Sequence, residues 1–199
     1  MSEVPISSTH TDDLSPLARQ ILSLDIENSY RLLVVRTPGR PEAQKLLSTA
    51  TPTQMLSSPI RNPDDANAIL AGLWLWHDWL DESHLISQSL HSSTGSFWHA
   101  IMHRREGDFS NSQYWYARCQ NHPVFQQLAH QANQILHPLP ADKSLLRLMS
   151  NGWNPNAFVD LIASIEPDPR DPKHLAAISL QQLEWRLLFD HCTRSGAGR

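Results

Sequence analysis

The chain has 199 residues, which is the size of a single domain, and its seven Trp add enough apolar area to a 40% hydrophobic composition to form a core. The formal net charge is −4, and the scattered Lys and Arg form no basic stripe of the kind that nucleic-acid-binding proteins carry. No apolar stretch approaches the length of a membrane span, and residues 1–5 lack a signal-peptide pattern. We therefore expect a protein without a nucleic-acid or membrane partner.

The two cysteines, Cys119 and Cys192, lie far apart in the sequence and form no CxxC pair. This usage is typical of a reduced chain without structural disulfides, so we expect a cytoplasmic protein. The sequence also contains no Gly-rich phosphate loop, no G-x-S-x-G and no H-E-x-x-H motif.

The first third of the chain predicts short helices separated by breaks. Residues 1–14 are polar and predict a disordered tail. A helix is expected from Ser15 to about Leu24, whereas Tyr30–Arg36 is either its end or one short strand. Another helix is expected over Pro41–Thr49, followed by irregular chain up to Asn62.

The central part predicts an antiparallel helix pair over residues 62–106. Asn62-Pro63-Asp64-Asp65 is a strong helix start, and the helix is expected to run to about His91. Ser92–Gly95 predicts a tight connection, and Ser96–Glu106 predicts the second helix. Further helices are expected over 110–122, 124–136, 142–150, 156–164 and 172–192, with a loose tail over 195–199. The predicted fold is all-α, a compact multi-helix domain over 15–194.

Histidines gather on this helix pair. On one uninterrupted helix, His77, His84 and His91, each seven residues apart, would lie along one line. On the second helix, His99 and His103 share one face with Glu106. A chain reversal near Ser93 would place His84 opposite His103, and Asp81 opposite Glu106.

Facing imidazoles and carboxylates predict a site for Zn²⁺ or Fe²⁺. The expected ligands are His84, His99, His103 and Glu106, with Asp81 as a further ligand or as the group that orients His84. Such a centre would serve a hydrolase or an oxygenase that acts on a small molecule. Further carboxylate ligands from other helices would have to come from Asp160, Glu184 or Asp190.

The same residues allow two metal-free interpretations. One is a polar seam of histidines and carboxylates that fixes helix packing. The other is an acid/base or anion site in which Asp81 acts and Arg104 binds a carboxylate or phosphate of the ligand. The alternative function is therefore a non-catalytic helical interaction module, such as a homodimer that uses a Trp-rich face.

The block Asp81–Gln88 and Gly95–Glu106, continued by Tyr114-Trp115-Tyr116, resembles a family of uncharacterised bacterial proteins, with similar sequences in fungi. Trp153–Asp160 and Glu184–Asp190 extend the resemblance over most of the chain from about residue 64. It implies a small helical domain and no particular chemistry. The chain departs from the family at Gly107, where Pro is expected, and before residue 60.

Overall fold

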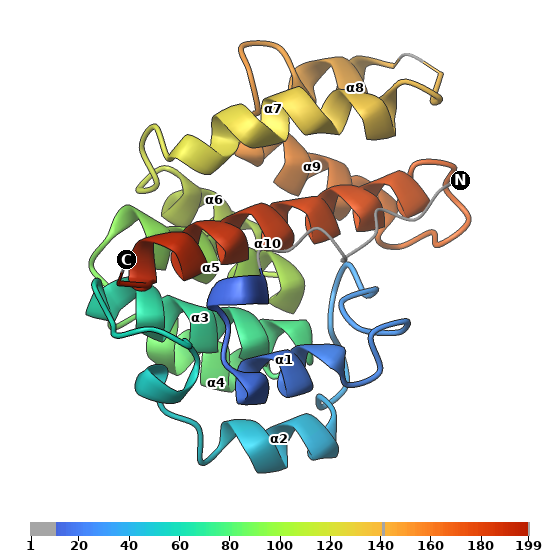
Figure 1. The fold of residues 1–199 in the computed structure, drawn as a ribbon. Helices are drawn as coiled ribbons and strands as arrows, with labels where there is room; N and C mark the ends of the chain where they lie inside the picture. Colours follow the sequence, from blue (N-terminus) through green and yellow to red (C-terminus); the bar gives the residue numbers. More distant parts are fainter. Residues whose placement is uncertain (1–10, 141, 199) are drawn as a thin grey trace.

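A computed structural model describes residues 11–140 and 142–198, and it confirms the all-α fold (Figure 1). Ten α-helices and two short 3-10 helices lie within these residues, which contain no β-strand. Their bounds are η2 (Thr11–Asp13), α1 (Pro16–Ser23), α2 (Pro41–Leu47), η3 (Pro52–Gln54), α3 (Pro63–Trp76), α4 (Leu80–Ser87), α5 (Ser93–Glu106), α6 (Phe109–Tyr116), α7 (Pro123–Leu136), α8 (Lys143–Leu148), α9 (Pro155–Ile165) and α10 (His174–Gly196).

Helix α10 crosses the middle of the molecule (Figure 1). Helices α7, α8 and α9 lie on one side of it, and α1 to α4 lie on the other. It packs directly against α3 and α7, while α5 packs against α3, α4 and α6. None of the described helices has the length and apolarity needed to cross a membrane.

The core beside α10 is built from aromatic rings. Trp185 stacks on Phe189 with 4.5 Å between ring centroids, and Trp76 approaches Trp185 at the same distance. Trp98, from α5, closes the cluster edge-on at 6.2 Å. Each indole N–H donates a hydrogen bond inside the core; that of Trp185 reaches the carbonyl of Gly72 at 2.8 Å. These buried contacts fix α3, α5 and α10 relative to one another.

The predicted helix from 62 to 91 is wrong in one respect, because the chain bends between α3 and α4. Asp78 has a left-handed backbone, with φ of 65°, and its carboxylate accepts a hydrogen bond from Arg105 at 2.7 Å. The same guanidinium donates to the carbonyl of Leu75 at 2.7 Å, which satisfies an open helix end. It also lies 4.0 Å from the ring centroid of Tyr30. A partner 27 residues away therefore stabilises the bend.

The connection between α4 and α5 lies slightly earlier than predicted. Helix α4 ends at Ser87, and α5 begins at Ser93, where the Ser92 hydroxyl caps it by accepting from the Gly95 amide at 3.1 Å. A Cβ on Gly95 would lie 2.3 Å from that of Leu90, so only glycine allows this close return of the chain.

Three other expectations need correction. Residues 1–10 lie outside the described chain, but the rest of the expected tail is ordered: η2 precedes Leu14, which is buried and bridges to Leu56. The expected loose end at 195–199 is structured over residues 195–198, because α10 continues to Gly196 and Ala197 pairs with Ile60. Residues 30–36 form neither helix nor strand.

Candidate metal centre

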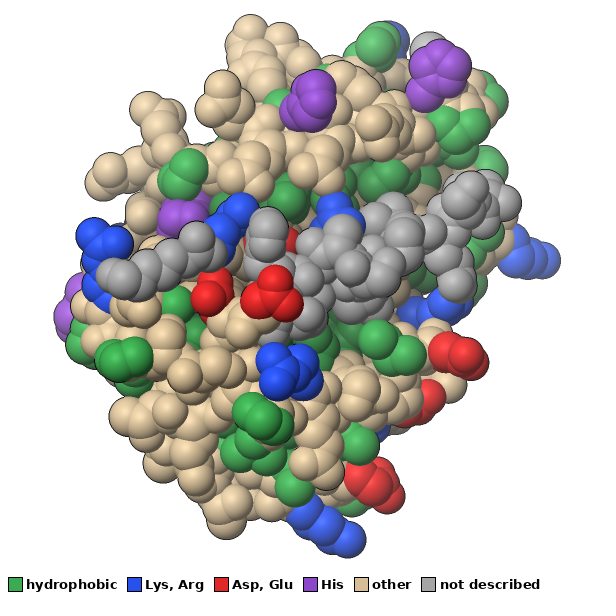
Figure 2. Space-filling view, viewed as in Figure 1, with side chains coloured by type: hydrophobic (Ala, Val, Ile, Leu, Met, Phe, Trp, Pro, Cys, Tyr) green, Lys and Arg blue, Asp and Glu red, His purple; other side chains and the backbone are tan. Residues whose placement is uncertain are grey.

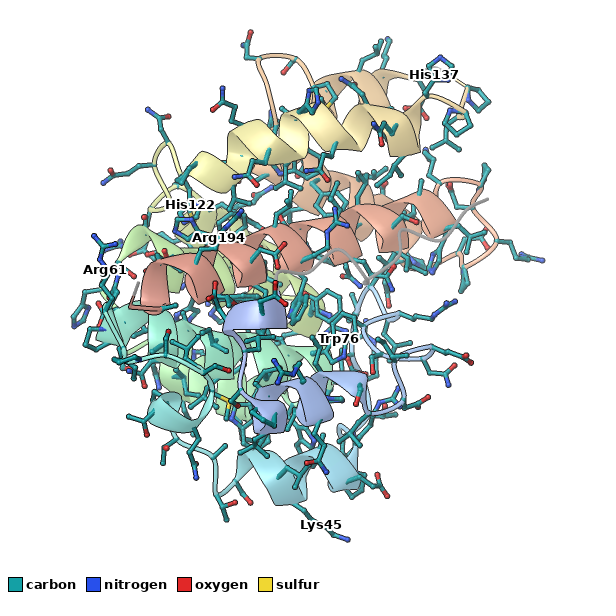
Figure 3. The ribbon with its side chains drawn as sticks, in the orientation of Figure 1. Lys45, Arg61, Trp76, His122, His137 and Arg194 are labelled. Atoms are coloured by element: carbon teal, nitrogen blue, oxygen red, sulfur yellow. The ribbon has the colours of Figure 1, made fainter. Side chains whose placement is uncertain are left out.

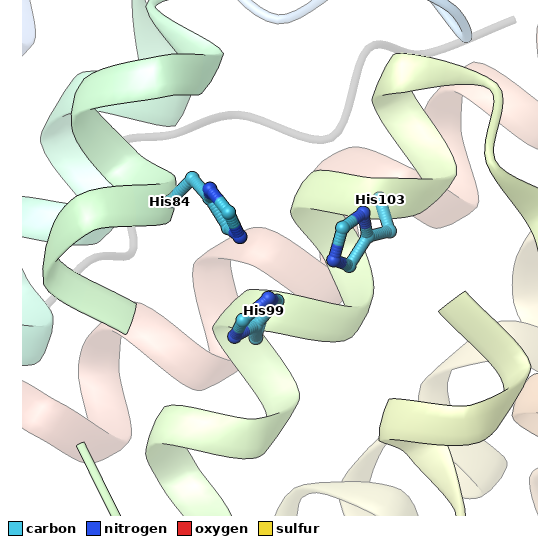
Figure 4. A group of neighbouring side chains, drawn as sticks. All are labelled: His84, His99 and His103. Atoms are coloured by element: carbon cyan, nitrogen blue, oxygen red, sulfur yellow. The ribbon is translucent and has the colours of Figure 1, made fainter. Parts of the chain in front are cut away.

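Three imidazole rings from two helices face a shared space (Figure 4). His84 comes from α4, and His99 and His103 come from successive turns of α5. The His84 ring centroid lies 4.7 Å from that of His99 and 5.4 Å from that of His103, while His99 and His103 stack at 4.7 Å. The prediction that His84 meets His103 across the connection is confirmed.

The His99 ring packs against Trp115 and makes no side-chain hydrogen bond to a described residue. Its ring stacks on Trp115 of α6, with 4.0 Å between centroids and 13° between planes. Its Nδ1 is buried and has no hydrogen-bond partner in the described chain. Burial, and to a lesser degree the nearby His103 and His84, lower the pKa of His99 to about 3. The ring is therefore neutral at pH 7, which is the form that binds metal ions.

His103 is oriented by two polar neighbours. Its Nδ1 lies 2.8 Å from Oε2 of Glu106, one turn later on α5. Because a carboxylate only accepts, Nδ1–H donates, and this tautomer leaves a lone pair on Nε2. The Asn111 amide nitrogen lies 3.1 Å from that Nε2. Glu106 is half-exposed, whereas His103 is buried.

The spacing of the three rings fits a metal ion. Each histidine offers one nitrogen such that all three lie within 4.8 Å of one another. Three atoms at most 4.8 Å apart share a point about 2.8 Å from each, compared with a Zn–N bond of about 2.0–2.1 Å. Shifts of less than about 1 Å per ring would bring the nitrogens to bonding distance.

The carboxylates predicted to join them lie elsewhere. Glu106 contacts His103 and does not belong to the group of three, and Asp81 is exposed on α4 without a hydrogen bond to a described residue. The carboxylates on other helices that could have supplied further ligands have other partners: Asp160 accepts a hydrogen bond from Gln113, and Glu184 accepts one from Arg104. Asp190, likewise, is not part of the group.

Arg104 does not face the histidines, which corrects its prediction as a ligand-binding residue. Its guanidinium is fully buried and donates to Glu184 and to the Tyr116 hydroxyl, each at 2.5 Å. The Tyr116 hydroxyl in turn donates to Glu184 at 2.9 Å. The charge of Glu184 keeps the pKa of Arg104 raised against the effect of burial. This network links α5, α6 and α10, and Glu184 already supplies the opposite charge that an anionic ligand would bring to Arg104.

The other two histidines of the predicted line do not share a helix with His84, because the bend separates His77 from it and α4 ends before His91. His77 caps the end of α3, and its Nε2 lies 2.8 Å from the carbonyl of Ile21 in the core. His91 is exposed in the connection before α5. The line of three was wrong because it required one continuous helix.

Sequence reasoning missed Asn111 and Trp115 as parts of the site. They are four residues apart on α6, so both face α5. On sequence grounds Trp115 could line a pocket, but aromatic residues at helical spacing are core residues more often than site residues, and Asn111 stood out only as a possible helix start.

Comparisons of the chain with protein-family models, with curated proteins and with solved structures found no match. The site is therefore interpreted from its own geometry.

Proposed function

We propose that this protein binds one divalent transition-metal ion through His84, His99 and His103. The observation that carries the proposal is the convergence of three imidazoles, of which His84 and His99 make no side-chain hydrogen bond to a described residue. His84 is half-buried, whereas Nδ1 of His99 is buried, and buried polar nitrogens are rarely left without partners such as a metal ion would supply. Glu106 fits the carboxylate that orients a metal-binding histidine.

Three neutral nitrogen ligands favour Zn²⁺ or Fe²⁺ over Mg²⁺ or Ca²⁺, which prefer oxygen. With three protein ligands, such an ion keeps a position open for water or for a substrate. Zn²⁺ would activate that water for hydrolysis, whereas Fe²⁺ would direct the open position to O₂. We therefore propose a metal-dependent hydrolase or oxygenase that acts on a small molecule, with no role for Arg104.

The second candidate is a non-catalytic helical module with a structural histidine seam. The contacts of His103 favour it, because Glu106 and Asn111 already occupy both ring nitrogens without a metal ion. Under this interpretation, the cluster only stabilises the packing of α4 on α5, with His99 stacked on Trp115.

Metal analysis of protein purified without an affinity tag separates the two candidates. The protein is stripped with a chelator, offered Zn²⁺ or Fe²⁺ (the latter without oxygen), and passed through a desalting column. The proposal predicts about one equivalent retained by the wild type and less than a tenth by His99→Ala, with His137→Ala unchanged. Retention of less than a tenth of an equivalent by the wild type would refute it and support the structural seam.

A further inference from the structure

A hollow of about 570 Å³ opens beside the end of α6 and the start of α7, and none of the three histidines lines it. It lies between the loop after α6, the first turns of α7 and the loop between α8 and α9. Its volume is within the range of sites for small organic ligands. The lining comprises Tyr116, Ala117, Gln120, Asn121, His122, Pro123, Phe125, Gln126, Ala129, Asn151, Gly152, Trp153 and Pro155.

The lining of this hollow carries no charge. None of the thirteen lining residues is Asp, Glu, Lys or Arg. Both nitrogens of His122 are engaged, Nδ1 with the Val124 amide and Nε2 with the Thr94 hydroxyl, each at 3.3 Å. A charged ligand would lose water here without gaining an opposite charge, so the hollow favours an uncharged ligand.

Hydrogen-bonding groups are nevertheless abundant in the lining. The side chains of Gln120, Asn121, Gln126 and Asn151 make no hydrogen bond to any described residue. Each carboxamide offers two N–H donors and one carbonyl acceptor. The indole N–H of Trp153 is buried and also has no partner in the described chain. Donors and acceptors therefore stand side by side, which suits hydroxyl groups because a hydroxyl both donates and accepts.

The aromatic rings of the hollow do not form a stacking slot. Trp153 is only 7% exposed and packs on Phe158 with 5.2 Å between ring centroids. Phe125 lies against Phe97 at 4.9 Å. A flat nucleobase needs an open aromatic face to stack on, and these rings do not offer one.

We propose that this hollow binds a neutral saccharide of one or two rings through the carboxamides of Gln120, Asn121, Gln126 and Asn151. The proposal does not rest on the metal centre, whose residues do not line the hollow. It gives the protein a second site, for an uncharged hydroxyl-rich ligand.

The test is an NMR titration of the full-length protein, in which the Trp153 indole N–H is assigned by its absence in Trp153→Phe. The neutral probes are methyl glucoside, methyl galactoside, maltose and cellobiose. The charged probes are glucuronate and glucose 6-phosphate, and the nucleoside probes are uridine and adenosine. At least one neutral probe is expected to shift the Trp153 signal with saturation, more strongly than every charged or nucleoside probe.

Variants then locate the binding. Asn151→Ala and Gln126→Ala each remove one exposed carboxamide and should weaken binding about fivefold. The matched control is Asn133→Ala, an exposed carboxamide on α7 outside the hollow, which should bind as the wild type does. No saturable shift from any neutral probe, stronger binding of a nucleoside or charged probe, or equal affinities in all three variants would each overturn the proposal.

Discussion

Two different contacts orient the buried histidines of the cluster: His99 stacks on Trp115, and His103 donates a hydrogen bond to Glu106. Stacking fixes the plane of one ring, and the carboxylate fixes the tautomer of the other. His84 has neither support, so its position depends on α4. At this scale, the residues that support the ligands matter as much as the ligands.

Glu106→Gln is expected to lower the Zn²⁺ affinity about tenfold, because the neutral amide makes His103 a weaker ligand. Competition with a coloured chelator measures the affinity. Asp81→Asn is the control, since Asp81 is exposed and does not belong to the group of three histidines, and it should stay within about twofold of the wild type. A larger loss in Asp81→Asn than in Glu106→Gln would restore Asp81 as a ligand.

His122 predicts a pH-dependent stability of the fold. Burial, followed by the nearby His191, lowers the pKa of His122 to about 4 from an ordinary value of about 6.5. Between these pH values the unfolded chain binds the extra proton, so the free energy of unfolding falls as pH falls. The loss from this group approaches about 3 kcal/mol at pH 4.

His122→Asn keeps a side-chain cap for α7 but removes this proton site. Urea unfolding at pH 7 and pH 4.5 should show a loss smaller by about 2 kcal/mol than in the wild type. His122 lies between the start of α7 and α10, whereas His137 lies at the outer end of α7 (Figure 3). His137→Asn should therefore lose as much stability as the wild type. Equal losses in wild type and His122→Asn would contradict this account.

Helix starts and helix breaks differ in how well the sequence predicts them. Asn62-Pro63, His122-Pro123 and Asn154-Pro155 each carry a capping side chain before a proline, so these starts were readable locally. The bend at Asp78 was not, because its stabilising partner, Arg105, is distant in sequence. The predicted meeting of His84 and His103 is nevertheless correct, because it depends only on the connection between α4 and α5, which packs α4 against α5.

Arg105→Met tests the bend. It leaves the Asp78 carboxylate without its buried donor and removes one of two donors from the carbonyls of Leu75 and Leu32, so it should lower the free energy of unfolding by about 3 kcal/mol. Arg118→Met is the control, because Arg118 is exposed, donates a hydrogen bond to the exposed Tyr114 hydroxyl and lies over the rings of Tyr114 and Trp115; its loss should cost less than about 1 kcal/mol. Similar losses in both variants would mean that the bend does not depend on Arg105.

At the scale of the whole molecule, one core joins α3, α5 and α10, and the two candidate sites lie in different places around it. The sequence predicted this core through its seven Trp and its helical periodicity, but could not order the helices around it. On the face seen in Figure 2, Lys and Arg stand apart among acidic side chains. The predicted absence of a nucleic-acid partner remains a prediction, as does the homodimer.

The substitution Gly72→Ala tests how closely the core is packed around α3. A Cβ at this position would lie 2.9 Å from the Trp98 ring and 3.1 Å from Phe189, neither of which has space to move. Gly72→Ala should therefore lower the free energy of unfolding by about 1–3 kcal/mol. Gly196→Ala, whose Cβ would meet its nearest atoms at 3.4 Å, should leave stability unchanged or raise it slightly. Thermal unfolding of both variants measures the difference.

X-ray absorption at the zinc edge tests the metal centre most directly, because it counts the imidazoles bound to the ion. The wild type loaded with one equivalent of Zn²⁺ should show three imidazole nitrogens at about 2.0–2.1 Å and a further light atom. In His84→Ala the count should fall to two, since His84 is the only ligand from α4. Fewer than two imidazoles in the wild type, or a count unchanged in His84→Ala, would contradict a metal site shared by the two helices.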